Sequence, residues 1–494
     1  MAALHRISME DLHQRRWELL ALTSVGAFMT PLDGSIVSVA IPVMSPELHL
    51  SFSATIWVQA AYLLTTAVLL ITFGRLSDHY GRVRSYLVGT AIFGVGSLLA
   101  GLSMNGPWHI GSRIFQGVGG ALLAATSAAI VTAVFPPQER GRALGINVMA
   151  VYLGLSVGPP LGGFITDNFG WRWIFYVNIP IALAVLVWGW LLLPRAELEN
   201  RGALRVDAVG ATLLGSFLIC LLVPLTFAPQ WGWLAARSLA MLGMAAVSVV
   251  LFVVVELRVR DPLLDLDLLR RNRLFATANG AALLNYMSLF AVSILTAIYL
   301  EVVQGRSAGL TGWIMLGQPI TQTVLSPFMG RLSDKVGSRV LTTTGMLLVA
   351  AGMALLASMP TTAGTAHVMG ALSVVGLGLA AFSAPNTSAI MGSVRRDQLG
   401  VASAFLATMR VTGQALSVAV LGGIAASTLG ALGGRLLFTH GGATGALVHG
   451  ASHVTENYAR GFTYAMATGA ALAVVGAGLS LTRGAQAQQE RPAG

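Results

Sequence analysis

The sequence predicts an all-α integral membrane protein with about fourteen transmembrane helices, and three observations lead to that fold class. Hydrophobic residues make up 55% of the 494 residues and charged residues only 10%, with a mean hydropathy of +0.73. A soluble domain carries about 25% charged residues. Apolar runs recur along the whole chain, each close to the roughly 20 residues with which a helix crosses about 30 Å of hydrocarbon. Helices are favoured over barrel strands, which would be about half as long, because a helix satisfies its own backbone hydrogen bonds in lipid.

The apolar runs place the expected spans in order along the chain. They are Trp17–Val43, Thr55–Phe73, Arg84–Leu102, Ile110–Val131, Ala143–Ile165, Trp173–Leu193, Asp207–Phe227, Leu239–Val255, Phe275–Tyr299, Leu310–Phe328, Val340–Leu356, Val368–Ile390, Val401–Ala425 and Phe462–Leu481. We expect no cleavable signal, because the segment Met1–Arg16 is polar and the first apolar run has no clear small-residue cleavage site.

Basic residues are distributed unevenly between the two sides of the expected membrane. Most of the 30 Lys and Arg residues lie in loops and tails on the side of the N-terminus. Because short cytoplasmic loops carry the excess of Lys and Arg, we expect both termini to be cytoplasmic in a multi-pass protein of the inner membrane, and residues 428–460 to be external. The net charge of +10 is spread over many short loops, which argues against a nucleic-acid-binding surface.

An internal repeat divides the chain. One short motif occurs twice. The first copy is Gly74-Arg75-Leu76-Ser77-Asp78, followed by Gly81 and Arg82, and the second copy is Gly330-Arg331-Leu332-Ser333-Asp334, followed by Gly337 and Arg339. The same offset places the first two expected spans on the ninth and tenth. We therefore predict a six-helix bundle in residues 1–195, two extra helices in 196–265 and a second six-helix bundle in 266–494. Parallel repeats of this kind occur in transporters whose substrate site lies near the membrane midplane between the halves.

The repeated loop predicts a charged latch at the cytoplasmic surface. Its glycines would let the second and third helices approach closely and turn, and Asp78 lies in sequence among Arg75, Arg82 and Arg84, close enough for ion pairs. The residues of this predicted latch are Gly74, Arg75, Asp78, Gly81, Arg82, Arg331 and Asp334. The alternative is that basic loops only fix orientation, but orientation requires charge and not a fixed order of residues.

Four motifs in this order resemble the major facilitator superfamily, and within it the fourteen-spanner drug:proton antiporters. The motifs are the loop Gly74–Arg84, the fourth-helix pattern Arg113-x-x-Gln116-Gly117-x-Gly119-Gly120-Ala121, the fifth-helix pattern Gly154-x-x-x-Gly158-Pro159-Pro160-Leu161-Gly162-Gly163, and the first-helix segment Leu32–Pro42. The first-helix motif of the family often has Thr and Asn where this chain has Ser35 and Ser38. The resemblance covers nearly the whole chain and implies the major facilitator fold, with proton-driven export.

The fifth expected helix has a bare face. Gly154, Gly158, Gly162 and Gly163 recur at helical spacing, so that another helix can pack against the backbone, and Pro159 is expected to bend the helix. Tight packing alone explains these glycines as well as a hinge between the halves does, and both interpretations stay open.

Charged residues inside the expected spans are the candidate coupling groups. Asp33 lies near the middle of the first span, too far from either surface for so short a side chain to reach water, while Arg113 lies in the fourth span. Burial disfavours a charged carboxylate and a neighbouring arginine favours it, so such a site can load and release a proton. The alternatives are an Asp33 that hydrogen-bonds backbone or Ser35, and an Arg113 that extends to the surface. Glu301, at the end of the ninth span, is a third candidate, for which an interfacial position is the simpler interpretation.

If the resemblance holds, a central cavity lies between the halves. Its candidate substrate-binding residues are Gln59, Tyr62, Gln116, Asn147, Tyr152, Asn285, Tyr286, Gln318, Asn386 and Arg410. Any one of these side chains could equally be a packing residue.

The sequence favours a proton-coupled antiporter that exports small amphipathic or cationic drugs, as opposed to an enzyme. The alternative is a transporter of the same fold that exports a native lipid, metabolite or siderophore. A membrane enzyme is disfavoured because no cluster of His, Asp or Cys recurs at one depth, and no Gly-Lys-Ser/Thr loop is present for ATP. We expect no cofactor and no metal, since Cys220 is the single cysteine; the expected partners are the substrate, protons and the lipid bilayer, with no obligate protein partner.

Overall fold

The computed structural model describes residues 14–136, 139–192, 207–259, 266–395, 398–429 and 448–483, and all regular structure within these ranges is helical. The first half contains α2 (Arg16–Glu47), α3 (Phe52–Tyr80), α4 (Arg82–Gly101), α5 (Gly106–Val134), α6 (Arg140–Phe169), α7 (Trp173–Tyr176) and α8 (Asn178–Leu192), followed by α9 (Ala208–Trp231) and α10 (Ala236–Glu256). The remaining helices are α11 (Leu266–Arg271), α12 (Arg273–Ile298), the π-helical turn η1 (Tyr299–Val303), α13 (Ala308–Met315), α14 (Gly317–Val336), α15 (Ser338–Ala357), α16 (Thr365–Gly392), α17 (Leu399–Ser427) and α19 (Val448–Leu481).

Thirteen helices in the described ranges are long and apolar enough to cross a membrane. The predicted tenth span, Leu310–Phe328, is instead divided between α13 and α14 at Leu316. Pro319 follows three residues later and has no backbone N–H to donate, which weakens one continuous helix there. The predicted count of about fourteen spans is therefore not confirmed, because this segment does not form one long apolar helix.

Two other span boundaries differ from the prediction. The sixth span begins with the short helix α7 and continues as α8 after Val177, and Pro180 lies in the first turn of α8. The last span begins much earlier than Phe462, because α19 starts at Val448. Part of the segment predicted to be an external loop is therefore helical, while residues 430–447 lie outside the described part of the chain.

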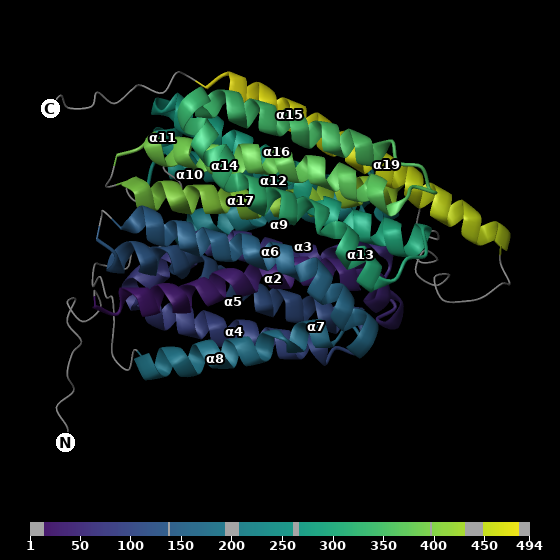
Figure 1. Cartoon of the computed structure of the whole chain (residues 1–494), viewed down its shortest axis with the longest axis horizontal. Coiled ribbons are helices and arrows are strands. Elements are labelled where there is room, and N and C mark those ends of the chain that lie inside the picture. The colour runs from purple at the N-terminus through teal and green to yellow at the C-terminus, as the bar shows by residue number, and fades with distance from the viewer. Residues whose placement is uncertain are drawn as a thin grey trace.

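The helices form two groups that lie side by side (Figure 1). Helices α2 and α4 to α8 lie together in the lower part of the view, and α12, α14 to α17 and α19 lie in the upper part. Helix α9 packs against both α3 and α17, so it touches both groups, whereas α10 packs against α9 at the periphery. The extra pair thus extends one side of the bundle.

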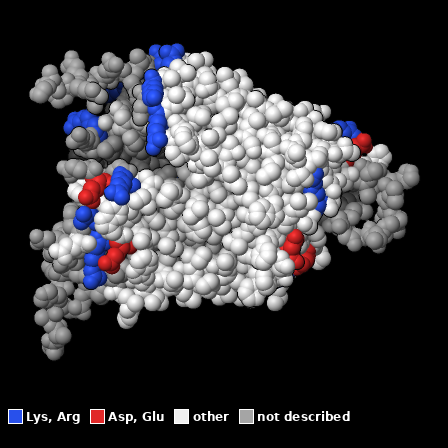
Figure 2. Space-filling view, in the orientation of Figure 1, with Lys and Arg blue, Asp and Glu red and all other residues white. Residues whose placement is uncertain are grey.

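Charged side chains lie at the two ends of the bundle, with a broad uncharged belt between them on the visible face (Figure 2). We call the end that holds the start of α2 and the turn between α3 and α4 the basic end; it includes Arg16, Arg82 and Arg84. The other is called the outer end. An uncharged belt between two charged ends is the surface expected of helices that cross a bilayer.

The repeated sequence motif forms a one-residue turn in both copies. Helix α3 continues to Tyr80, and Gly81, with φ +98°, separates it from α4. Gly337, with φ +86°, separates α14 from α15 in the same way. This left-handed conformation requires glycine at both positions. The predicted close approach at Gly74 was wrong, because Gly74 lies inside α3 and a Cβ added there would meet nothing within 4 Å.

Candidate functional site

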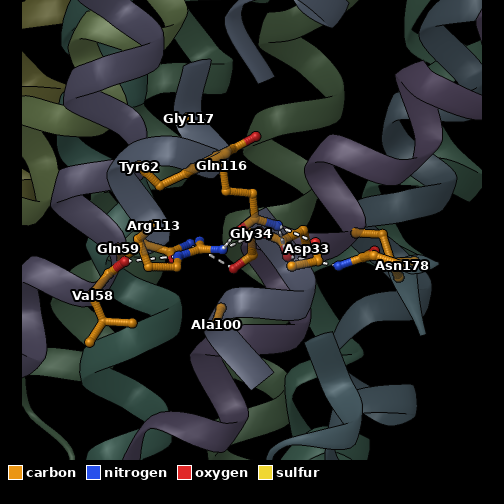
Figure 3. Close-up of polar contacts among 12 residues, drawn as sticks. Asp33, Gly34, Val58, Gln59, Tyr62, Ala100, Arg113, Gln116, Gly117 and Asn178 are labelled. Atoms are coloured by element: carbon orange, nitrogen blue, oxygen red, sulfur yellow. Dashed lines mark hydrogen bonds and ion pairs between the residues drawn. The ribbon is translucent and has the colours of Figure 1, made fainter. Parts of the chain in front are cut away.

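A buried carboxylate, Asp33, lies near the middle of α2 and is held by side chains from α5 and α8 (Figure 3). Arg113 on α5 places Nη1 2.6 Å from Asp33 Oδ2. Gln116, also on α5, and Asn178 at the start of α8 each donate a side-chain amide to Asp33 Oδ1 at 2.9 Å. All four side chains are 0% exposed. The structure therefore brings together Asp33 and Arg113, the two charged residues that the sequence indicated as candidate coupling groups.

The guanidinium of Arg113 is surrounded by acceptors. Its Nε donates to the backbone oxygen of Val58 at 3.1 Å, and its Nη2 lies 3.5 Å from Gln59 Oε1. A further contact joins Arg113 Nη1 to Gln116 Oε1. The guanidinium also lies 4.7 Å from the centre of the Tyr62 ring, where a cation–π interaction is favourable. Arg113 is thus held at depth and does not extend to the surface.

Helix starts set the depth of these side chains. Asn105 caps α5 by accepting from the Trp108 N–H at 3.0 Å, and Ser51 caps α3 by accepting from the Ala54 N–H at 3.4 Å. Both caps lie at the outer end. The side-chain oxygens of Asn and Ser satisfy N–H groups of the first helical turn, which have no partner within the helix. Arg113 and Gln59 each follow their cap by about two turns of helix, so they lie at a similar depth.

Gln59 connects the ion pair to a central cavity. Its Nε2 donates to the backbone oxygen of Gly34 at 2.7 Å, while its Oε1 faces Arg113. Gly34 and Gln59 both line the cavity, but Asp33 and Arg113 do not. The carboxylate is therefore one side chain away from the cavity and is not in direct contact with its contents.

The cavity lies between the two halves and comprises about 950 Å³ of space free of protein atoms, including the part open to solvent. The lining residues are Gly34, Ser35, Ser38, Gln59, Tyr152, Leu155, Pro159, Tyr286, Leu289, Phe290, Ser293, Ile294, Thr296, Met315, Gln318, Pro319, Gln322, Leu372, Leu379, Ser383 and Gln414. The lining surface is mostly apolar, and amide and hydroxyl side chains are distributed over it.

The outer end of the cavity is closed by direct contact between α6 and α13. A Cβ on Gly163 would collide with the backbone oxygen of Ala308, and one on Gly312 would collide with that of Pro159. The Gly309 N–H donates to Asp167 Oδ2 at 2.7 Å, which joins the two halves by a charge-assisted hydrogen bond. These contacts hold the halves together on the side away from the basic end.

The predicted substrate-binding residues divide into two groups. Gln59, Tyr152, Tyr286 and Gln318 line the cavity. Five others do not line the cavity and are buried within one half or the other: Tyr62, Gln116, Asn147, Asn285 and Asn386. Their prediction as cavity residues was wrong, because each faces a neighbouring helix: Asn147 donates to Ser127 Oγ at 3.0 Å and Asn285 donates to Met346 Sδ at 3.1 Å.

Asn386 and Arg410 have different surroundings. Asn386, on α16, donates to the Ala278 backbone oxygen at 3.2 Å and accepts from Arg483, so it joins α16 to α12 and to the residues that follow α19. Arg410 is half-buried on α17, one turn before the cavity residue Gln414. It is near the cavity without being part of its wall.

The glycine-rich face of α6 packs mainly against α2 of the same half. An added Cβ on Gly154 would collide with the Phe28 backbone oxygen, and one on Gly162 would lie 2.7 Å from that of Ile36. Gly158 faces Ser35, whose hydroxyl donates to the Gly154 backbone oxygen at 3.2 Å. Helix α6 continues through Pro159 and Pro160. Of the four motif glycines, Gly163 is the one in contact with the opposite half.

Within the predicted latch, Arg82 and Asp78 form an ion pair. Arg82 Nε lies 2.6 Å from Asp78 Oδ1, and Arg82 Nη1 donates to the Ala129 backbone oxygen of α5 at 3.0 Å. These contacts tie the turn between α3 and α4 to α5 within the first half. Arg75 lies one turn earlier on α3, and Arg331 is exposed on α14. The side chain of Asp334 lies outside the described set.

Glu301 lies in the π-helical turn η1 at the outer end and is half-buried. Its Oε1 atom has no hydrogen-bond partner in the part of the chain that the structure describes. Its carboxylate interacts electrostatically with that of Asp167, which belongs to the contact between α6 and α13. Glu301 therefore lies beside the closed outer end, apart from the Asp33 site.

Two residues around Asp33 were missed from the sequence. Asn178 donates directly to the carboxylate, and Ser97 on α4 accepts from Gln116 Nε2 at 2.7 Å. A single Asn in an apolar span is a signal in itself, because polar side chains inside a membrane helix face partners or cavities. Nothing in the sequence specified that its partner would be Asp33.

Comparison with known proteins identifies the family. The sequence model of the Major Facilitator Superfamily matches residues 23–263 and 278–451. The chain belongs to this superfamily. A Major Facilitator Superfamily protein is a membrane transporter, and the family together with the transporter-named relatives indicates a transporter and not an enzyme.

Relatives and a solved structure agree with this assignment. The chain is 34% identical over 421 residues to the riboflavin transporter RibZ of Clostridioides difficile (strain 630), which covers 84% of this chain and 90% of that protein. It is 34% identical over 425 residues to the multidrug resistance protein Stp of Mycobacterium tuberculosis (strain CDC 1551 / Oshkosh), covering 84% and 77%. The fold matches a bacterial homologue of the human lysosomal transporter Spinster, solved in an inward-facing and unoccupied conformation, with a TM-score of 0.65, 15% identity and coverage of 94% and 96%.

Proposed function

We propose that this protein exports small amphipathic compounds across the bacterial cytoplasmic membrane in exchange for protons, by alternating access. The observation that carries the proposal is the buried Asp33–Arg113 pair, separated by Gln59 from a cavity that is closed at the outer end. The similarity to a multidrug resistance protein supports export of small molecules. The excess of arginine at the basic end supports a cytoplasmic location for that end.

Proton binding at Asp33 changes the forces within the first half. The ionised carboxylate accepts hydrogen bonds from Arg113, Gln116 and Asn178. When the carboxylate binds a proton it loses its charge, and Arg113 is left without a countercharge at a depth where an uncompensated charge is costly. The hydrogen bonds of Gln59, which contacts both the pair and the cavity wall, must then change. Proton binding and the shape of the cavity are coupled through this one amide.

The test is export driven by an imposed proton gradient in proteoliposomes. We expect the wild-type protein to move a fluorescent amphipathic dye against its concentration gradient and to lose this activity when a protonophore is added. Asp33→Asn should abolish accumulation while passive dye exchange remains. Glu18→Gln removes an exposed carboxylate from the same helix and should behave as the wild type does. Protonophore-sensitive accumulation by the Asp33→Asn protein would place the coupling group elsewhere, with Glu301 next in line.

A second candidate function is export of a metabolite of the cell itself. The observation in its favour is the similarity to a protein named as a riboflavin transporter, which covers 90% of that protein's length. The two functions predict different behaviour in the same liposomes. A metabolite transporter would move one compound with high preference, whereas a multidrug exporter would move several unrelated dyes with similar efficiency.

A further inference from the structure

The charges around the cavity are unbalanced. None of its lining side chains is acidic or basic in the described part of the chain. Asp33 is neutralised by Arg113 behind Gln59. The remaining charged side chain near the centre is Arg410, half-buried on α17.

Arg410 has no described counterion. Unlike Arg113, it forms no hydrogen bond or ion pair with any residue that the structure describes. Helices α12, α16 and α17 contain no Asp or Glu, and Asp167 on α6 lies about two turns of helix beyond the lining residue Pro159, toward the outer end. An arginine within a membrane span normally pairs with an acid or with backbone carbonyls, or faces a water-filled cavity, and it often marks a substrate pathway.

Arg410 lies close to the cavity wall, one turn of helix from a lining residue. Helix α17 packs directly on α12 at Gly413, where an added Cβ would lie 2.9 Å from Tyr286 Cβ. Gln414, one turn after Arg410, lines the cavity, and the Arg410 guanidinium interacts electrostatically with the Tyr286 phenol. Since α17 runs from the basic end toward the outer end, Arg410 lies one turn of helix nearer to the basic end than Gln414.

The rest of the wall suits a flat ring system. Tyr152 on α6 and Tyr286 on α12 come from opposite halves and both line the cavity, and Phe290 lies one turn beyond Tyr286. Aromatic side chains stack on planar rings. Four amides, those of Gln59, Gln318, Gln322 and Gln414, supply donors and acceptors for carbonyl and hydroxyl groups on a ring.

We propose that the cavity selects planar aromatic anions, with Arg410 binding the anionic group. In the low dielectric of the bundle an uncompensated positive charge attracts a phenolate or carboxylate and repels a permanent cation. This substrate class differs in charge from the cationic compounds among the small amphipathic or cationic drugs expected from the sequence. The inference rests on the proposed function only in taking the cavity as the site of the transported compound.

The test compares two xanthene dyes of similar shape and opposite charge on the purified full-length protein in detergent. The dyes are fluorescein, at a pH where its phenol and carboxyl group are ionised, and rhodamine 123, and the readout is fluorescence anisotropy. We expect fluorescein to bind more tightly than rhodamine 123. Arg410→Gln should weaken fluorescein binding about tenfold, the loss of one hydrogen bond to a charged group, and should not weaken rhodamine 123 binding.

Two further variants complete the experiment. Arg410→Lys keeps the charge and should retain a preference for fluorescein, while Arg258→Gln removes an exposed arginine at the end of α10 and should change neither affinity. A wild-type preference for rhodamine 123, an unchanged ratio in Arg410→Gln, or no binding of either dye would each overturn the proposal. Because binding is measured without a membrane or a proton gradient, failure of proton-driven export would not alter this result.

Discussion

Asp33 and Arg113 occupy the middle of the first half as a pair, and neither is exposed. The energetics of such a pair are asymmetric. Removing one partner leaves an uncompensated buried charge and costs about 3–5 kcal/mol, whereas removing both can be nearly neutral. Gln116 and Asn178 satisfy the other carboxylate oxygen, so the whole cluster responds when either charge changes.

This asymmetry predicts the stability of two variants relative to the wild type. Asp33→Asn should lower the stability of the purified protein by about 3–5 kcal/mol, because Arg113 is left charged without a partner. The double variant Asp33→Asn/Arg113→Gln should recover most of that loss, although it should not export. Thermal unfolding in detergent measures all three proteins in parallel. A single Asn variant as stable as the wild type would mean that other groups balance the charge of Arg113.

Helices α3 and α4 form an element that joins the basic end to the interior. Gly81 turns the chain within one residue, and Arg82 then contacts both Asp78 and the backbone of α5. The Asp78–Arg82 pair is partly exposed, and such pairs contribute about 0–1 kcal/mol. Its effect on folding is therefore small, while its position at the end of three helices lets it influence how the first half moves.

Asp78→Asn should consequently leave the expression level and the unfolding temperature nearly unchanged. The export rate should fall about two- to fivefold, because loss of the ion pair shifts the conformational equilibrium by up to about 1 kcal/mol. Initial rates of dye export from proteoliposomes measure this, with Glu456→Gln, an exposed carboxylate on α19, as the control. An export rate equal to that of the wild type would reduce the motif to a determinant of orientation.

The whole molecule is held closed at the outer end by α6 and α13, where Asp167 joins the backbone of α13 across the two halves. Alternating access requires this contact to break when the cavity opens to the other side. The single cysteine of the chain, Cys220, is buried on α9, so it can be replaced to give a cysteine-free background.

In a Cys220→Ser background, cysteines introduced at Asp167 and Gly309 should form a disulfide readily, because the side chain of the first touches the backbone of the second. Oxidation should abolish export and leave dye binding from the basic end intact, and reduction should restore export. The two single-cysteine proteins are the controls for oxidation itself. Undiminished export by the fully cross-linked protein would show that the outer end does not open there.

The sequence by itself determined the features that depend on local composition. Hydropathy over about 20 residues decides whether a segment crosses lipid, so most spans lie close to where they were predicted. The isolated charges Asp33 and Arg113 were recognisable as candidates because a charged residue in a span is costly unless it has a partner. The repeated glycine turn was likewise visible, since Gly81 and Gly337 adopt a conformation that other residues disfavour.

Only the tertiary structure decided which side chains meet. Whether a polar residue faces the cavity or its own bundle depends on the rotation of its helix, which is set by packing against neighbours and leaves no mark in hydropathy. For that reason Tyr152 and Tyr286 line the cavity while Asn147 and Asn285 bond within one half. The same packing placed Arg113 against Asp33 but left Arg410 without a described acid, a difference between two arginines that look alike in the sequence.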